Sequence, residues 1–160
     1  MFRILLPVAA LATAFAGFAS AQTAEPADKT PEIFQSTGLI GTWATNCKAP
    51  ASHDNLYMVF SLMPNGKVKR EFFDGPKLYN TYSIYDAKVE GDEITFTASD
   101  MNIPYVDWSI GPYNRDYEIS FVKKDDAIRL WNSGGPRGMI VEGGQAIDTH
   151  VETAWQTKCR

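Results

Sequence analysis

Cysteine and histidine, the usual side-chain ligands of zinc, are rare in this sequence of 160 residues. Its only cysteines and histidines are Cys47, Cys159, His53 and His150. Zinc sites built on such residues use closely spaced pairs such as Cys-x-x-Cys, and the sequence contains no such pair. His53 stands beside Asp54 in a polar stretch, which is typical of a solvated turn. We therefore expect no metal and no cofactor.

Pairs of acidic residues are the other candidates for catalysis. The pairs at 92–93 and 125–126 lie in predicted turns, where carboxylates accept hydrogen bonds from backbone N–H groups. Asp107 and Asp116 form a third pair, whose separation in space the sequence does not give. The HExxH, GxSxG and phosphate-binding glycine motifs are all missing. The sequence therefore favours a binding protein over an enzyme.

The first 21 residues have the pattern of a secretory signal peptide. Arg3 precedes an uncharged apolar run at 4–18, and Ala19 and Ala21 supply the small residues that cleavage requires. The run is shorter than the roughly 20 residues that span a bilayer. We predict cleavage after Ala21, no membrane anchor afterwards, and a periplasmic or secreted bacterial protein.

The rest of the chain is predicted to be a flexible lead-in at 22–30 followed by one domain at 31–160. The formal net charge is −4, and removal of the signal peptide would bring it to −5 because only Arg3 is lost. The basic stretch at 67–70 alternates as a strand does and has acidic neighbours. We therefore expect no nucleic-acid partner. We also expect a monomer.

Export also bears on the cysteines, because oxidising compartments favour disulfides. We predict a Cys47–Cys159 disulfide; two free thiols or half of a metal site are the alternatives. Such a bond closes a loop of nearly the whole domain, for which the chain-entropy model gives about 4–5 kcal/mol of stabilisation.

Short β-strands dominate the predicted domain. Alternating apolar residues and Gly-containing turns predict antiparallel strands at 41–47, 56–63, 67–74, 78–89, 93–99, 115–122, 127–133 and 138–143. Thr30 is predicted to cap a helix of at most two turns that ends at Gly38. The tail from 145 fits a helix or a strand; we expect an extended segment with Trp155 packed inward beside the cystine. This pattern predicts an all-β antiparallel meander, closed as a barrel or a sandwich.

The segment 100–114 is an unusually long connection that is rich in aromatic residues. Loops of this length are uncommon unless they are functional, although an extra edge strand would also fit. A second group of tyrosines lies along the predicted strand 78–89. The candidate ligand- or partner-binding residues are Tyr105, Trp108, Tyr113, Tyr79 and Tyr85.

The order of a short helix, a Gly41-x-Trp43 strand and an antiparallel meander resembles the lipocalins and the wider calycin group. The resemblance implies an about eight-stranded barrel in which Trp43 packs across the closed end under the helix. Residues 115–117 resemble the second lipocalin motif, and Arg129 or Arg137 would lie over the tryptophan in a cation–π contact. The chain is also similar to small exported proteobacterial proteins that pair GTW…C with W…KC and have no assigned activity.

Two binding functions follow from these features. The lipocalin resemblance implies a carrier of a small apolar or amphipathic ligand. The alternative is a periplasmic inhibitor or other protein-binding module that presents the 100–114 loop to an envelope protein. The predicted inward residues are mostly large, which favours a packed interior: Trp43, Leu56, Met58, Phe60, Phe72, Ile94, Phe96, Tyr117, Phe121 and Leu130.

Overall fold

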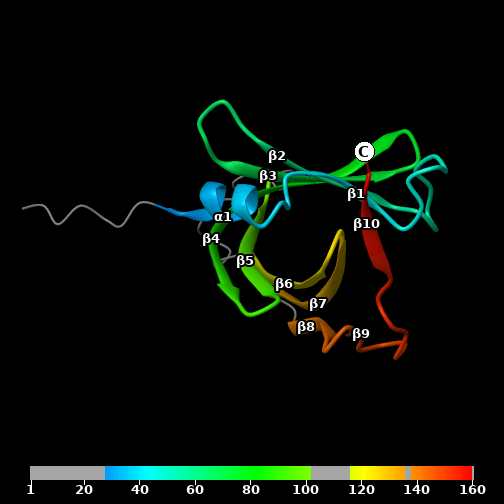
Figure 1. Ribbon diagram of the computed structural model, residues 1–160. Helices are drawn as coiled ribbons and strands as arrows, with labels where there is room; N and C mark the ends of the chain where they lie inside the picture. The colour runs from blue at the N-terminus through cyan, green and yellow to red at the C-terminus, as the bar shows by residue number, and fades with distance from the viewer. Residues whose placement is uncertain (1–27, 102–115, 136–137, 160) are drawn as a thin grey trace, which may run out of the picture.

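Antiparallel strands form most of the structure, and eight of them make a closed barrel (Figure 1). The computed structural model describes residues 28–101, 116–135 and 138–159. It confirms the predicted all-β meander with a short helix before the first strand. The elements are α1 (Thr30–Ser36), β1 (Gly41–Ala44), β2 (Tyr57–Leu62), β3 (Val68–Asp74), β4 (Lys77–Glu90), β5 (Glu93–Asp100), β6 (Asp116–Lys124), β7 (Ala127–Gly135), β8 (Gly138–Glu142), β9 (Gln145–Ala146) and β10 (Trp155–Cys159).

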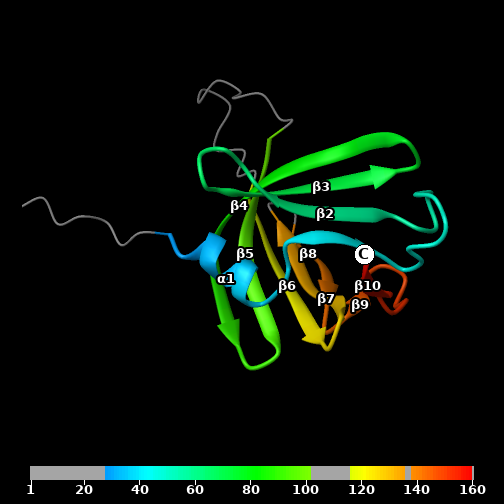
Figure 2. The same cartoon turned by 45° about the horizontal axis from the view of Figure 1, so that its top comes forward.

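The barrel is closed by its last strand. Strands β1 to β7 follow one another around the wall, and β10 lies between β1 and β7. Thr157 of β10 is opposite Ala44 on β1 and Ala127 on β7. β7 is longer than β10, and its last residues, 133–135, pair with β8 instead. β8 and β9 therefore continue the wall of β7 beyond the closing strand (Figure 2).

The fully buried side chains gather where α1 lies against the barrel. Phe34 of α1 packs edge to face on Phe60 and Phe96, with ring centroids 5.2 and 5.3 Å apart. Phe121 stacks on Phe96 at 6.0 Å. Leu56 is a correction to the predicted core: it precedes β2 and is 37% exposed. The closed layer, as we call the larger of these fully buried side chains, is Phe34, Leu39, Trp43, Met58, Phe60, Val68, Ile84, Ile94, Phe96, Phe121 and Ile128.

A buried hydroxyl fixes α1 to the barrel. The predicted capping role of Thr30 is wrong, because Lys29 is the N-cap and Thr30 is the first helical residue. The Thr30 hydroxyl donates to Asp28 Oδ1 at 2.6 Å and accepts the backbone N–H of Ala87 at 2.9 Å. That N–H belongs to a β-bulge of β4, where the ladder with β5 shifts register. Thr30 therefore belongs to the folded domain rather than to the predicted lead-in at 22–30.

The Gly-x-Trp stretch of β1 closes the helix end of the barrel. The Trp43 indole N–H donates to the Leu39 carbonyl at 2.8 Å, and the Lys158 ammonium lies 5.7 Å from the indole ring centroid. Lys158 also donates to the Gly38 carbonyl at 2.7 Å. Gly41 has φ +135°, and a Cβ there would lie 2.8 Å from the Lys158 Cε. The glycine thus leaves room for the lysine that covers the tryptophan.

The resemblance assigns the cation over Trp43 to Arg129 or Arg137, and the structure corrects the expectation for Arg129. Lys158 of the last strand occupies that position. The side chains of β7 alternate, so Ile128 is buried inside the barrel and Arg129 points away from it. Arg137 lies outside the described residues.

Arg129 instead ties the segment after β8 to β7. Its guanidinium donates to the Gly144 carbonyl at 2.8 Å and to the Thr153 hydroxyl at 3.1 Å. It also forms an ion pair with Glu152 at 3.3 Å. The contacts of Arg129 are therefore structural, and they stabilise the β8–β9 side of the barrel instead of covering Trp43.

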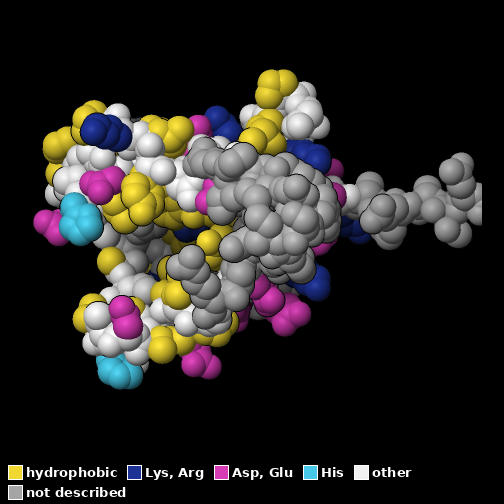
Figure 3. All heavy atoms as spheres, turned by 180° about the vertical axis from the view of Figure 1, so that it is seen from behind, with side chains coloured by type: hydrophobic (Ala, Val, Ile, Leu, Met, Phe, Trp, Pro, Cys, Tyr) yellow, Lys and Arg dark blue, Asp and Glu magenta, His cyan; other side chains and the backbone are white. Residues whose placement is uncertain are grey.

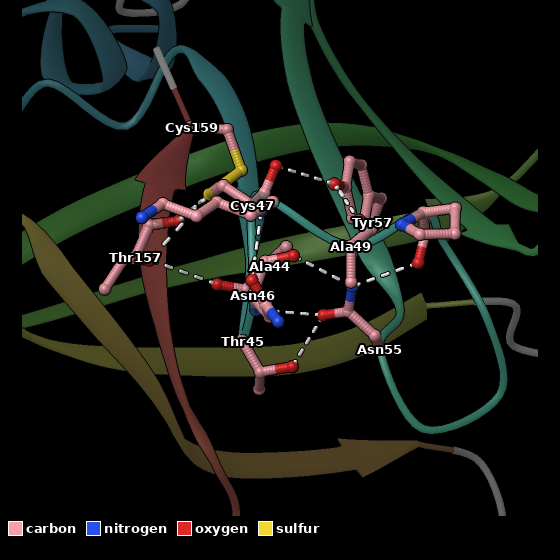
Figure 4. The surroundings of a disulfide bond; sticks show 11 residues. Ala44, Thr45, Asn46, Cys47, Ala49, Asn55, Tyr57, Thr157 and Cys159 are labelled. Carbon is pink, nitrogen blue, oxygen red and sulfur yellow. Dashed lines mark hydrogen bonds between the residues drawn. A yellow bond between two sulfur atoms is a disulfide. The ribbon is translucent and has the colours of Figure 1, made fainter.

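The predicted disulfide between Cys47 and Cys159 is confirmed, with Cα atoms 5.3 Å apart (Figure 4). Cys47 lies in the connection between β1 and β2, which Asn55 holds together. The Asn55 side-chain oxygen accepts the Asn46 N–H at 2.9 Å, and its amide nitrogen donates to the Asn46 carbonyl at 3.0 Å. The disulfide therefore joins the closing strand to an internally hydrogen-bonded loop.

The tail is extended, as expected, but Trp155 is not packed inward. Lys158 is on the Trp43 side of β10, so Trp155 and Cys159, at odd spacings from it, face outward. Trp155 is 42% exposed. The predicted signal peptide at 1–21 lies outside the described residues and stays a prediction. None of the described helical residues form a helix long and apolar enough to cross a membrane.

Candidate ligand-binding site

Beside the closed layer, the barrel interior has a second group of side chains that are only half buried. They lie on the inward faces of β3, β4, β6 and β7 and pack against the closed layer from one side. Three of their rings form an edge-to-face series, with centroids 6.1 and 5.9 Å apart. We call this set the open layer; its members are Phe72, Tyr82, Tyr117 and Leu130.

Between the two layers lies a buried arginine, Arg70, in the middle of β3. Its guanidinium carbon is 4.1 Å from the centroid of the Phe72 ring and 5.3 Å from that of Phe121. The Phe60 and Tyr82 rings follow at 5.9 and 6.0 Å. Rings from four strands therefore surround one cation inside the barrel.

Arg70 is only 5% exposed, and burial lowers its pKa to about 9. The interaction with Tyr82 acts in the opposite direction but is the smaller effect. Nε donates to the Met58 sulfur at 3.0 Å, and a thioether is a weak acceptor. Among residues 28–101, 116–135 and 138–159, no carboxylate forms an ion pair with Arg70. A buried cation with these neighbours is a strong candidate for a functional group.

A short polar network adjoins the arginine on β4 and β5. The Asn80 amide donates to the Tyr82 hydroxyl at 2.8 Å and to the Asp100 carboxylate at 3.0 Å. Burial raises the pKa of Tyr82, with Arg70 acting against that shift and Asp100 and Tyr117 adding to it. The interior therefore offers hydrogen-bonding groups next to apolar rings, which is the usual composition of a small-molecule site.

The space-filling view shows where the molecule is open. Seen from behind, it is hollowed between two walls, and hydrophobic side chains lie around the hollow (Figure 3). The described aromatic side chains of the open layer are half buried rather than sealed, in contrast to those of the closed layer. The side chains on the helix side of the barrel are thus fully buried, and those of the open layer are partly exposed.

The structure places the predicted binding tyrosines of β4 outside the barrel. Tyr79 is 76% exposed. Tyr85 is opposite Thr97 and forms a hydrogen bond with Asp116. Desolvation first, and then that hydrogen bond, raise the pKa of Tyr85 above its ordinary value. Neither tyrosine meets Arg70, whereas Tyr82, between them on the same strand, does. Their binding role stays a prediction.

The other predicted binding residues, Tyr105, Trp108 and Tyr113, lie outside the described residues, so the 100–114 loop stays a prediction as well. His53, unlike the buried Arg70, is on the surface: its side chain is 91% exposed and lies 3.6 Å from the Asp74 carboxylate. Within the part of the chain that the structure describes, no three His, Cys, Asp or Glu side chains gather as a metal site would require.

A separate groove of about 420 Å³ lies on the outer surface of the barrel, where β5 to β8 meet. Thr97 and Glu118 are paired across β5 and β6 and face away from the buried Phe96 and Ala98. Asp116 adds a second carboxylate to this groove. Two acidic groups on an open surface are weaker grounds for a ligand site than a buried cation.

Sequence reasoning missed Arg70, although the alternation of β3 contains it. Val68, Arg70 and Phe72 are two residues apart and share one face, while Lys69 and Glu71 share the other and form an ion pair at 3.0 Å. A charged residue between two apolar residues on the same strand face is the sequence pattern that could have indicated a buried arginine.

Comparisons with protein-family models, with curated proteins and with solved structures find no match to this chain. The fold is a closed antiparallel barrel of eight strands, which is consistent with the resemblance to a small calycin-like barrel. The function proposed below therefore rests on the residues of this chain.

Proposed function

We propose that this protein is an exported, non-catalytic carrier that binds a small amphipathic molecule inside the barrel, in contact with the open layer. The observation that supports this is the difference in filling between the two layers. The closed layer is fully buried, whereas Phe72, Tyr82, Tyr117 and Leu130 are only partly covered. Barrels of eight strands are wide enough either to be packed solid or to hold one small ligand.

The chemistry of the open layer selects an amphipathic ligand. Two phenol rings, a phenylalanine and a leucine provide apolar surface, and the network of Asn80, Tyr82 and Asp100 provides polar contacts beside it. Such a ligand would remove half-buried apolar surface from water. This contributes about 25 cal/mol of favourable free energy for each Å² covered. Export and a periplasmic location belong to this proposal, and the confirmed disulfide supports them.

The test is titration of the mature protein with the neutral apolar dye N-phenyl-1-naphthylamine, followed by dye fluorescence. We expect saturable binding at one site. Leu130→Trp, inside the open layer, should weaken binding at least tenfold because it fills space that the dye would occupy. Leu78→Trp is the matched control, since Leu78 is 49% exposed on β4, and it should bind as the unchanged protein does. Absence of saturable binding, or equal loss in both variants, would contradict the proposal.

A further inference from the structure

Arg70 carries several hydrogen-bond donors for which the described residues offer no acceptor. A guanidinium has five N–H donors, and among the described residues the acceptor found for Arg70 is the Met58 sulfur, 3.0 Å from Nε. Among the described residues, none accepts a hydrogen bond from the other four N–H groups. Arg70 is 5% exposed, and its Nη atoms are not among the described side-chain atoms that are fully sealed without a partner, so they keep a little contact with solvent. A ligand that excludes this water must supply acceptors in its place.

The aromatic rings around the guanidinium hold it in place but do not accept hydrogen bonds from its N–H groups. The Phe72 ring, at 4.1 Å, covers one face of the group, and the Phe121 ring lies 5.3 Å away across the barrel. Ring faces attract a cation electrostatically but accept no strong hydrogen bonds in the plane of the guanidinium. The arginine is therefore fixed in position while its in-plane donors remain available.

The open layer is next to these donors. Phe72 contacts both Arg70 and Tyr82, and the Tyr82 ring in turn meets Tyr117 at 5.9 Å. A molecule that covers these rings would therefore have one end close to the guanidinium. An ion of opposite charge at that end would form charge-assisted hydrogen bonds, and a carboxylate matches the two-pronged geometry of arginine.

We propose that Arg70 binds the carboxylate of an amphipathic monocarboxylic acid, whose apolar part packs against the open layer. This inference rests on the proposed function and adds the charge and the position of the ligand head group. It also accounts for an arginine that is expensive to bury in the empty barrel: the charge is compensated when the acid binds.

The experiment compares two ligands that differ only in charge, laurate and 1-dodecanol, by isothermal titration calorimetry. The unchanged protein should bind laurate about 10–100-fold more tightly, since hydrogen bonds to charged groups contribute about 1.5–3 kcal/mol. Arg70→Met should remove that preference and leave dodecanol binding nearly unchanged. Lys69→Met is the matched control on the outward face of the same strand and should keep the preference.

The outcomes separate this inference from the proposed function. If the unchanged protein binds both ligands equally, or if Arg70→Met weakens both equally, the assignment of the carboxylate to Arg70 is wrong and the carrier function stands. If the unchanged protein binds neither the dye nor either ligand, both proposals are wrong.

A second measurement needs no variant. Carbon-13 NMR of carboxyl-labelled laurate should show that the bound carboxyl group titrates at a lower pH than the free acid, because a neighbouring cation stabilises the carboxylate. A bound carboxyl group that titrates as it does in solution would overturn the inference even if Arg70→Met failed to fold.

Discussion

The closed and open layers use the same kinds of side chain for different purposes. In the closed layer, Phe34, Phe60 and Phe96 contact one another from the helix and two strands, and all are fully buried. In the open layer, Phe72, Tyr82 and Tyr117 touch in series but leave part of each ring uncovered. Arg70 lies at the boundary, in contact with both. The helix covers only one end of the barrel, which explains why the side chains at that end are sealed and those of the open layer are partly exposed.

The largest expected effect is on the closed layer. Trp43→Ala should lower the free energy of unfolding by about 3–5 kcal/mol, because it leaves a cavity under the helix and removes the partner of Lys158. Urea denaturation followed by circular dichroism measures this. Trp155→Ala is the matched control, since that tryptophan is 42% exposed, and should cost much less. Equal losses would show that the two tryptophans are not distinguished by burial.

Reduction of the Cys47–Cys159 bond should have the next largest effect. The bond spans 112 residues and joins the closing strand to the β1–β2 connection, so we expect a loss of about 2–4 kcal/mol. The far-ultraviolet β-signal should persist below the lowered melting temperature. A melting temperature unchanged by reductant would mean that the strand pairing of β10 is sufficient without the bond.

Arg70→Met should change stability in the opposite direction from these two. Methionine needs no hydration and fills similar space, so the empty protein should gain about 1–3 kcal/mol, as other replacements of buried charged groups do. Urea denaturation at pH 7 without ligand tests this, with Lys69→Met as the control. A destabilised Arg70→Met protein would indicate that Arg70 stabilises the packing of the closed layer against the open layer and would argue against a ligand-binding role.

The smallest expected effect concerns pH. Burial lowers the pKa of Arg70 to about 9, so its charge is present at pH 7.5 and largely lost at pH 10. Laurate should bind about tenfold more weakly at pH 10, whereas dodecanol should not. Tyr82 faces the guanidinium from β4, with Asp100 and Tyr117 beside it, and its raised pKa keeps its hydroxyl neutral over most of this range. Parallel weakening of both ligands would point to a change in the whole barrel.

The strands and the disulfide could be predicted from the sequence because local pattern and compartment determine them. Alternation and turn residues placed β2 to β8 within a few residues of their positions. The tail was less predictable, because a spacing of four fits a helix and a strand equally and does not say which face is inside. Trp155 is outward since Lys158, through Trp43, sets the inward face of β10.

The interior site could not be predicted in the same way. Alternation put Arg70 on the face of Val68 and Phe72, but its charge argued for the surface, and only the three-dimensional structure shows that four rings receive it. Likewise, Tyr79 and Tyr85 share one face of β4, and the sequence alone does not show that this face is the outer one.

The closing strand also sets the order in which the barrel can form during synthesis. β10 is the last of the described strands, and its partners are β1, near the start of the domain, and β7. The wall from β1 to β7 can pair as it is made, each strand with the one before it. The ring itself cannot close until residues 155–159 have been made, and this long-range contact comes last. Formation of the Cys47–Cys159 bond thus marks a barrel whose closing strand is in place.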